Sequence, residues 1–121
     1  MRAPRTDDRY RTAHARLDRL RAHLQTSAPR ELVSSMEAIS AVLDELMVLS
    51  TGGGAPSRAA VHAVHCLVER LSVHCAVLED ALEEQNLTRD VRRGVTGVVE
   101  ACADIATSAM ELPAVAAAHV A

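Results

Sequence analysis

Aromatic side chains are almost absent from this chain: it has no Phe and no Trp, and Tyr10 is its only Tyr. Hydrophobic residues still make up 49% of the sequence, so the core must be built from Leu, Val, Ile, Met, Ala and Cys. This composition favours helices, because strands are enriched in aromatic as well as β-branched residues. The lack of rings also argues against modules that stack bases on aromatic side chains, so we do not expect single-stranded nucleic acid as a ligand.

Lysine is missing as well, and all 13 basic residues are Arg. We attribute this to a GC-rich coding bias and not to function. The charge is unevenly distributed, with a net charge of +5 over residues 1–30 and −8 over residues 31–121. Such asymmetry predicts either pairing between the two parts of the chain or an N-terminal end that faces nucleic acid.

Several motifs that carry catalysis or bind cofactors do not occur. The chain has no Glu-x-x-His of di-iron bundles, no Cys-x-x-Cys-His, no phosphate-binding Gly-x-x-x-x-Gly-Lys, no Gly-x-Ser-x-Gly and no Gly-x-Gly-x-x-Gly. The run Gly52-Gly53-Gly54 is followed by Ala and Pro without a Lys, which is typical of a linker. We therefore expect a protein that is not an enzyme and has no cofactor, with a zinc ion as the one alternative.

The three cysteines, Cys66, Cys75 and Cys102, are an odd number and lie within apolar helical patterns. They lack the paired spacing of a secreted disulfide scaffold, so we expect free thiols in a reducing cytoplasm. The charged start of the chain has no apolar signal-peptide region, and no uninterrupted apolar run reaches the ~20 residues of a membrane span. We expect neither secretion nor membrane insertion.

The apolar residues recur at spacings of 3 and 4, which predicts amphipathic helices. The predicted helices cover about 6–27, 29–50, 57–85 and 88–112, within a single domain of residues 1–113 that is followed by an Ala-rich tail at 114–121. The third has the longest seam, from Val61 to Leu82, and is apolar on more than one face. The simplest all-α solution is an up-down-up-down four-helix bundle, and the alternative is helical hairpins assembled into a dimeric bundle.

A metal site is one candidate, because four groups that can bind zinc fall within two turns of the third helix: His62, His65, Cys66 and Glu69. One helix supplies two or three ligands at most, so a site needs a partner helix, with His14 or His23 as contributors, or a second subunit. The alternative is that these are ordinary surface residues. Cys66 is also a candidate redox-reactive thiol, whereas Cys75 is predicted to be a small hydrophobic core residue.

A phosphate-contacting surface is a second candidate, on the first helix, and consists of Arg5, Arg9, Arg11, Arg16 and Arg19. The alternative is intramolecular pairing. Arg9, Arg16 and Arg21 flank the apolar seam, where they would meet acids of neighbouring helices such as Glu79.

The second and third helices carry more apolar residues than one core-facing stripe needs, namely Val42, Val48, Leu49, Cys66, Val73 and Val77. Monomers rarely expose large apolar patches, so this surface is predicted to be an interface. The leading hypothesis is a cytoplasmic helical interaction module, an adaptor or regulator that forms a homodimer and binds a protein partner. The alternatives are a small-molecule or metal sensor, with its ligand in the bundle or at the dimer seam, and an Arg-driven DNA-binding regulator.

Overall fold

The computed structural model describes residues 6–24, 30–51, 57–84 and 87–110. These segments form four α-helices and contain no strand: α1 (Thr6–His23), α2 (Arg30–Thr51), α3 (Arg58–Glu84) and α4 (Arg89–Met110). The prediction of an all-α fold with four helices is confirmed. Helix α1 ends at His23, earlier than predicted, while the predicted tail at 114–121 and the glycine-rich linker lie outside the described residues.

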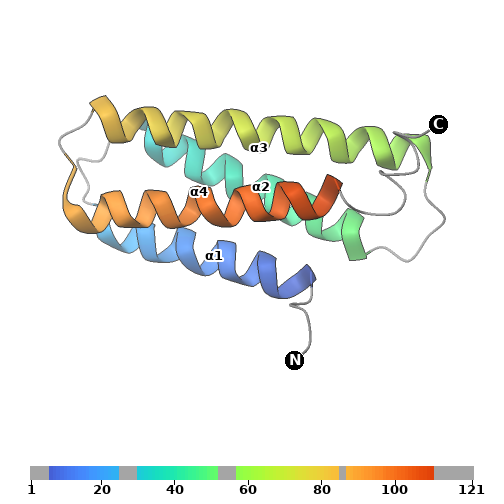
Figure 1. The fold of residues 1–121 in the computed structure, drawn as a ribbon, viewed down its shortest axis with the longest axis horizontal. Helices are drawn as coiled ribbons and strands as arrows, with labels where there is room; N and C mark the ends of the chain where they lie inside the picture. Colours follow the sequence, from blue (N-terminus) through green and yellow to red (C-terminus); the bar gives the residue numbers. More distant parts are fainter. Residues whose placement is uncertain (1–5, 25–29, 52–56, 85–86, 111–121) are drawn as a thin grey trace.

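The four helices lie side by side along one long axis, and consecutive helices run in opposite directions (Figure 1). Helix α1 packs against α2 and α4, and α3 packs against the same two helices. The surface between α2 and α3 and the surface between α1 and α4 therefore lie on opposite sides of the bundle.

The core is aliphatic, as the composition predicted, with Tyr10 buried among the aliphatic side chains. The predicted stripes of α1, α2 and α4 point inward, and the largest fully buried side chains are Leu17, Leu20, Leu32, Met36, Ile39, Leu43, Leu46, Leu71, Leu78, Val95, Val98 and Ile105. The seam of α3 is shifted from the predicted one. Leu67 is buried there, whereas Val61 and Val68 are only half-buried.

Helices α3 and α4 both begin with a side-chain cap. Ser57 Oγ accepts a hydrogen bond from the amide of Ala60 at 3.0 Å. Thr88 Oγ1 accepts one from the amide of Val91 at 3.3 Å. These bonds satisfy backbone donors that a helix start would otherwise leave without a helical partner.

Helices α1 and α4 approach closely because α4 presents small residues to α1. A Cβ atom placed on Gly94 would lie 2.9 Å from Leu20 Cδ1, a distance shorter than van der Waals contact. Ala101, one heptad further along, is buried, and Ser108 follows after another heptad. These small residues allow the close packing of the two helices.

Candidate functional site

The outer surface between α2 and α3 is hollowed into a groove of about 570 Å³. Its lining comes from both helices and consists of Asp44, Glu45, Val48, Leu49, Ala63, Cys66, Leu67 and Arg70. Val48 has 66% of its surface exposed, which is unusual for an aliphatic side chain beside a groove. The predicted interface residues Val48, Leu49 and Cys66 are thus brought together from two helices.

A second exposed apolar position lies further along α3, beyond the exposed charged residues Glu69 and Arg70. Val73 follows Cys66 by seven residues, two helical turns, and so lies on nearly the same stripe of the helix. It has 61% of its surface exposed, and Val77 on the next turn is half-buried. We call the surface formed by Val48, Leu49, Cys66, Val73 and Val77 the α2/α3 apolar face.

Val42 does not belong to this face, and its predicted place in the interface is wrong. Its side chain is only 6% exposed and packs in the core of the chain's own bundle. The inward stripe of α2 is wide enough to include both Val42 and Leu43, so the bundle already covers an apolar residue that the sequence pattern had assigned to the outside.

Helix α3 has an apolar composition but is only partly buried in the bundle. Residues 58–83 form a helix long and apolar enough to cross a membrane by length and composition alone, and the absence of membrane insertion stays a prediction. The core helix of a soluble bundle can pass the same test, but such a helix is mostly buried. Here only 22% of the apolar window is buried in the bundle. Within α3, however, Val64, Leu67, Leu71 and Leu78 are buried and most other large apolar side chains pack partly against the core, so Val73 is the large apolar residue of this helix that is exposed.

The charged rim of the α2/α3 groove carries both signs. Asp44 Oδ1 lies 3.0 Å from His14 Nε2 on α1, so this carboxylate has a partner within the bundle. Glu45 and Arg70 are exposed, and neither forms an ion pair with another residue of the described segments. The groove therefore offers one acidic and one basic group that remain available to a partner.

The predicted metal ligands are only partly brought together. Cys66 Sγ lies 3.5 Å from His62 Nε2, one turn apart on α3. Among the residues that the structure describes, no group of three His, Cys, Asp or Glu side chains is arranged to hold a metal ion. His65 and Glu69 do not complete such a group, and His14 is engaged with Asp44. A zinc site that draws ligands from a second subunit stays a prediction.

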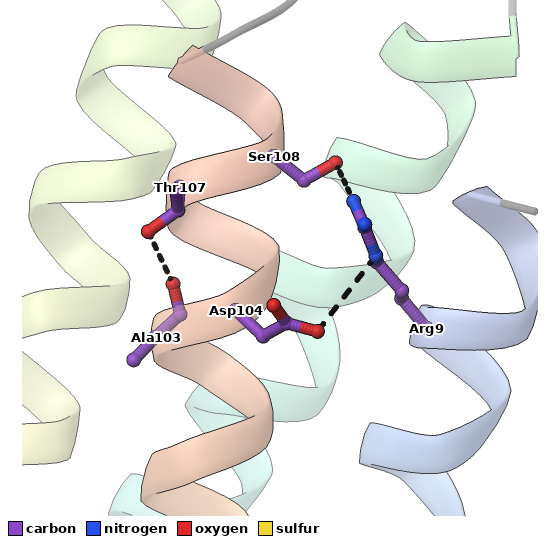
Figure 2. Close-up of polar contacts among 5 residues, drawn as sticks. All are labelled: Arg9, Ala103, Asp104, Thr107 and Ser108. Carbon is purple, nitrogen blue, oxygen red and sulfur yellow. Dashed lines mark hydrogen bonds and ion pairs between the residues drawn. The ribbon is translucent and has the colours of Figure 1, made fainter. Parts of the chain in front are cut away.

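The arginines of α1 divide between internal pairing and exposure. Arg9 contacts Asp104 on α4, with 3.7 Å between Arg9 Nε and Asp104 Oδ2, and also donates to the hydroxyl of Ser108 (Figure 2). Arg21 pairs with Asp18 of its own helix at 3.3 Å. Pairing with a neighbouring helix is confirmed for Arg9, whereas Arg21 pairs within its own helix. Glu79 is not the partner of either arginine, because α1 makes its main contacts with α4 and α2.

Arg16 and the remaining members of the predicted phosphate-contacting set behave differently. Arg16 is half-buried, and its Nη1 donates to the backbone carbonyl of Gly97 at 2.8 Å. Arg11 and Arg19 are exposed, and Arg5 lies outside the described residues. Of the predicted set, α1 thus presents Arg11 and Arg19 to solvent, and a phosphate-contacting surface on this helix stays a prediction.

A second groove, which the sequence analysis missed, lies between the C-terminal half of α1 and the N-terminal half of α4. It measures about 750 Å³ and has Gly94 and Gly97 in its lining. Its basic lining residues are Arg16, Arg19, His23, Arg89, Arg92 and Arg93. We call it the α1/α4 basic groove. The run of arginines at the start of α4 is visible in the sequence, but its place beside α1 follows only from the packing of the two helices.

Two thiols meet between α3 and α4, an arrangement that sequence reasoning also missed. Cys75 is half-buried and Cys102 buried, and both line a small cavity of about 240 Å³. A hydrogen bond from the Cys102 thiol lowers the pKa of Cys75, against the opposing effects of burial and of Glu79. The same contact and burial raise the pKa of Cys102. Cys75, predicted to be a plain core residue, is therefore the thiol more readily ionised of this pair.

No protein-family model, curated protein or solved structure matches this chain. Function is therefore inferred from the surfaces of the chain itself.

Proposed function

We propose that this protein is a non-enzymatic helical interaction module of the cytoplasm that forms a homodimer through its α2/α3 apolar face. The observation that carries the proposal is the exposure of two valines on this face, Val48 on α2 with 66% and Val73 on α3 with 61% of the surface exposed. Apolar surface of this kind favours association because burying it removes it from water.

A second copy of the chain is the partner that the charges of the groove fit best. In a two-fold symmetric dimer the same face is used twice, so that a residue on one copy meets its complement on the other and the reverse contact also forms. Glu45 on α2 and Arg70 on α3 lie on opposite walls of the groove and have no ion-pair partner in the described segments. A symmetric dimer would bring Glu45 of each copy to Arg70 of the other, forming two equivalent pairs.

The contribution of each part of the face is expected to differ. The valines at the centre supply most of the favourable free energy, since a fully buried Val contributes about 1.5–3 kcal/mol. The Glu45 and Arg70 pairs at the rim contribute little affinity, because solvent screens them, but they set the orientation of the two copies. An adaptor or regulator built in this way would present its remaining surfaces, on α1 and α4, to other molecules.

Sedimentation velocity over a concentration series tests this proposal. We expect the wild-type chain to sediment as a dimer that dissociates on dilution, and Val48→Glu and Val73→Glu to shift it to monomer, because a buried unpaired carboxylate is strongly unfavourable. Ala15→Glu is the matched control, since Ala15 is exposed on α1, away from this face. It should leave the dimer intact.

Two results would contradict the proposal. The first is a wild-type chain that stays monomeric at every concentration and instead pellets with lipid vesicles, which would assign the apolar face to a membrane surface. The second is a dimer that survives both Val→Glu substitutions, which would place the interface elsewhere. Circular dichroism of each variant establishes that the helices are retained.

A further inference from the structure

The α1/α4 basic groove has more positively charged side chains than its acidic side chains can neutralise. Five arginines line it, together with His23, against two acids, Asp90 and Glu100. No ion pair among the described residues joins any of these five arginines to an acid. The groove is therefore a concave site of positive potential, which concentrates anions.

Two of these arginines are held in place by neutral backbone carbonyls. Arg16 Nη1 donates to Gly97 O at 2.8 Å, and Arg92 Nε donates to Leu87 O at 3.4 Å. These bonds orient the guanidinium groups without cancelling their charge. Arg19, Arg89 and Arg93 are exposed at the groove, with their donors open to solvent.

We propose that this groove binds a small molecule with two or more phosphate groups. Guanidinium groups match phosphate oxygens in geometry and bind them through paired, charge-assisted hydrogen bonds. Because the arginines come from both walls, one phosphate cannot engage all of them, whereas a chain of phosphates can extend along the groove. A volume of about 750 Å³ is also in the range of sites for small ligands.

The two acids of the groove favour a small ligand over a long polyanion such as DNA. Asp90 and Glu100 line the same groove as the arginines, so they would repel the uniform phosphate backbone of DNA. A short run of phosphates can instead lie against the arginines and leave these two carboxylates to solvent. No aromatic residue lines the groove, so a nucleobase would find no ring to stack on, and the ligand is recognised through its phosphates.

This site is independent of the proposed dimer, because it lies on the opposite side of the bundle from the α2/α3 apolar face. A monomeric variant such as Val73→Glu should bind the anion as well as the wild type does. Failure of one proposal therefore leaves the other standing.

Isothermal titration calorimetry of the full chain, with inorganic tripolyphosphate, ATP and GTP as probes, tests the proposal. We expect all three to bind with similar affinity, because the phosphates and not the bases are recognised, and the affinity to fall with added salt. The double variant Arg19→Gln/Arg93→Gln should bind tripolyphosphate at least about tenfold more weakly, since it loses two charged hydrogen-bond donors. Arg11→Gln is the matched control, because Arg11 is exposed on α1 but does not line the groove.

Three outcomes would overturn the proposal. One is no binding of tripolyphosphate or nucleotide by the wild type at low salt. Another is a loss of binding free energy in the double variant no larger than twice the loss in Arg11→Gln. Because the double variant removes two charges and the control one, this would indicate a diffuse effect of net charge and no defined site. The third is tighter binding of a short DNA duplex than of tripolyphosphate at the same ionic strength, which would make this surface a nucleic-acid interface.

Discussion

The guanidinium of Arg16 on α1 donates a hydrogen bond to the backbone carbonyl of Gly97 on α4, with 2.8 Å between Arg16 Nη1 and Gly97 O. This carbonyl lies in the middle of a helix, where access to it depends on a small residue. One turn away, Gly94 lets Leu20 of α1 pack directly against the backbone of α4. The two glycines thus have different roles in the same helix contact, and substitutions can separate them.

Replacing Gly94 with Ala is expected to destabilise the fold. The added methyl group would lie 2.9 Å from Leu20 Cδ1 and 3.4 Å from Leu20 Cβ, and Leu20 is fully buried and has little room to move. Overpacking of this kind costs about 1–3 kcal/mol, which exceeds the gain of about 1 kcal/mol in helix propensity. Urea denaturation should show a lower free energy of unfolding for Gly94→Ala. A variant more stable than wild type would show that the close α1/α4 contact is absent.

Replacing Gly97 with Ala is expected to have the opposite effect. The nearest atom to the added methyl group would be Arg16 Cδ at 3.6 Å, an ordinary van der Waals distance. The gain in helix propensity is then realised, and the free energy of unfolding should rise by up to about 1 kcal/mol. The same denaturation experiment measures it. Destabilisation of similar size in both glycine variants would argue against the distinction drawn here.

The Cys75–Cys102 contact predicts a pH-dependent reactivity. Only the thiolate is alkylated, and the lowered pKa of Cys75 means that its thiolate forms at lower pH than that of an ordinary cysteine. Cys102→Ala removes the donor, so the midpoint of Cys75 alkylation by iodoacetamide should move to higher pH. Peptide mass spectrometry on a Cys66→Ala background follows this one site. An unchanged midpoint would mean that the Cys102 thiol does not stabilise the Cys75 thiolate.

Periodicity predicted the helices and most of the core, because an amphipathic helix shows its buried stripe in the spacing of its own apolar residues. It failed on α3, whose apolar residues cover more than one face. Spacing alone could not choose between a stripe through Val68 and one through Leu67, and the packing against α2 and α4 selects Leu67. The same ambiguity placed Val42 on the outside of α2.

The candidate sites were harder to predict because they are built from two helices each. The α1/α4 basic groove joins Arg19 to Arg93, and the thiol contact joins Cys75 to Cys102. Each pair depends on which helices are neighbours and on the register between them. Neither property is encoded in the spacing within one helix. The sequence predicted that Arg9 pairs within the bundle, but it could not identify Asp104 as the partner, because that choice also depends on which helix lies beside α1.

The central claim is a symmetric dimer through the α2/α3 apolar face, and mixing two charge-reversal variants tests it most directly. In an Arg70→Glu homodimer both rim pairs become acid against acid, and in a Glu45→Arg homodimer both become base against base. A mixed dimer of the two variants would instead restore both attractive pairs.

Native mass spectrometry of each variant alone and of an equimolar mixture, with one chain isotopically labelled, makes the measurement. We predict that each variant alone dimerises more weakly than wild type, because like charges then face each other, and that the mixture preferentially forms a dimer containing one chain of each kind. If each variant alone dimerises as well as wild type, or if the mixture gives no heterodimer, the two copies do not meet through Glu45 and Arg70 and the proposed interface is contradicted.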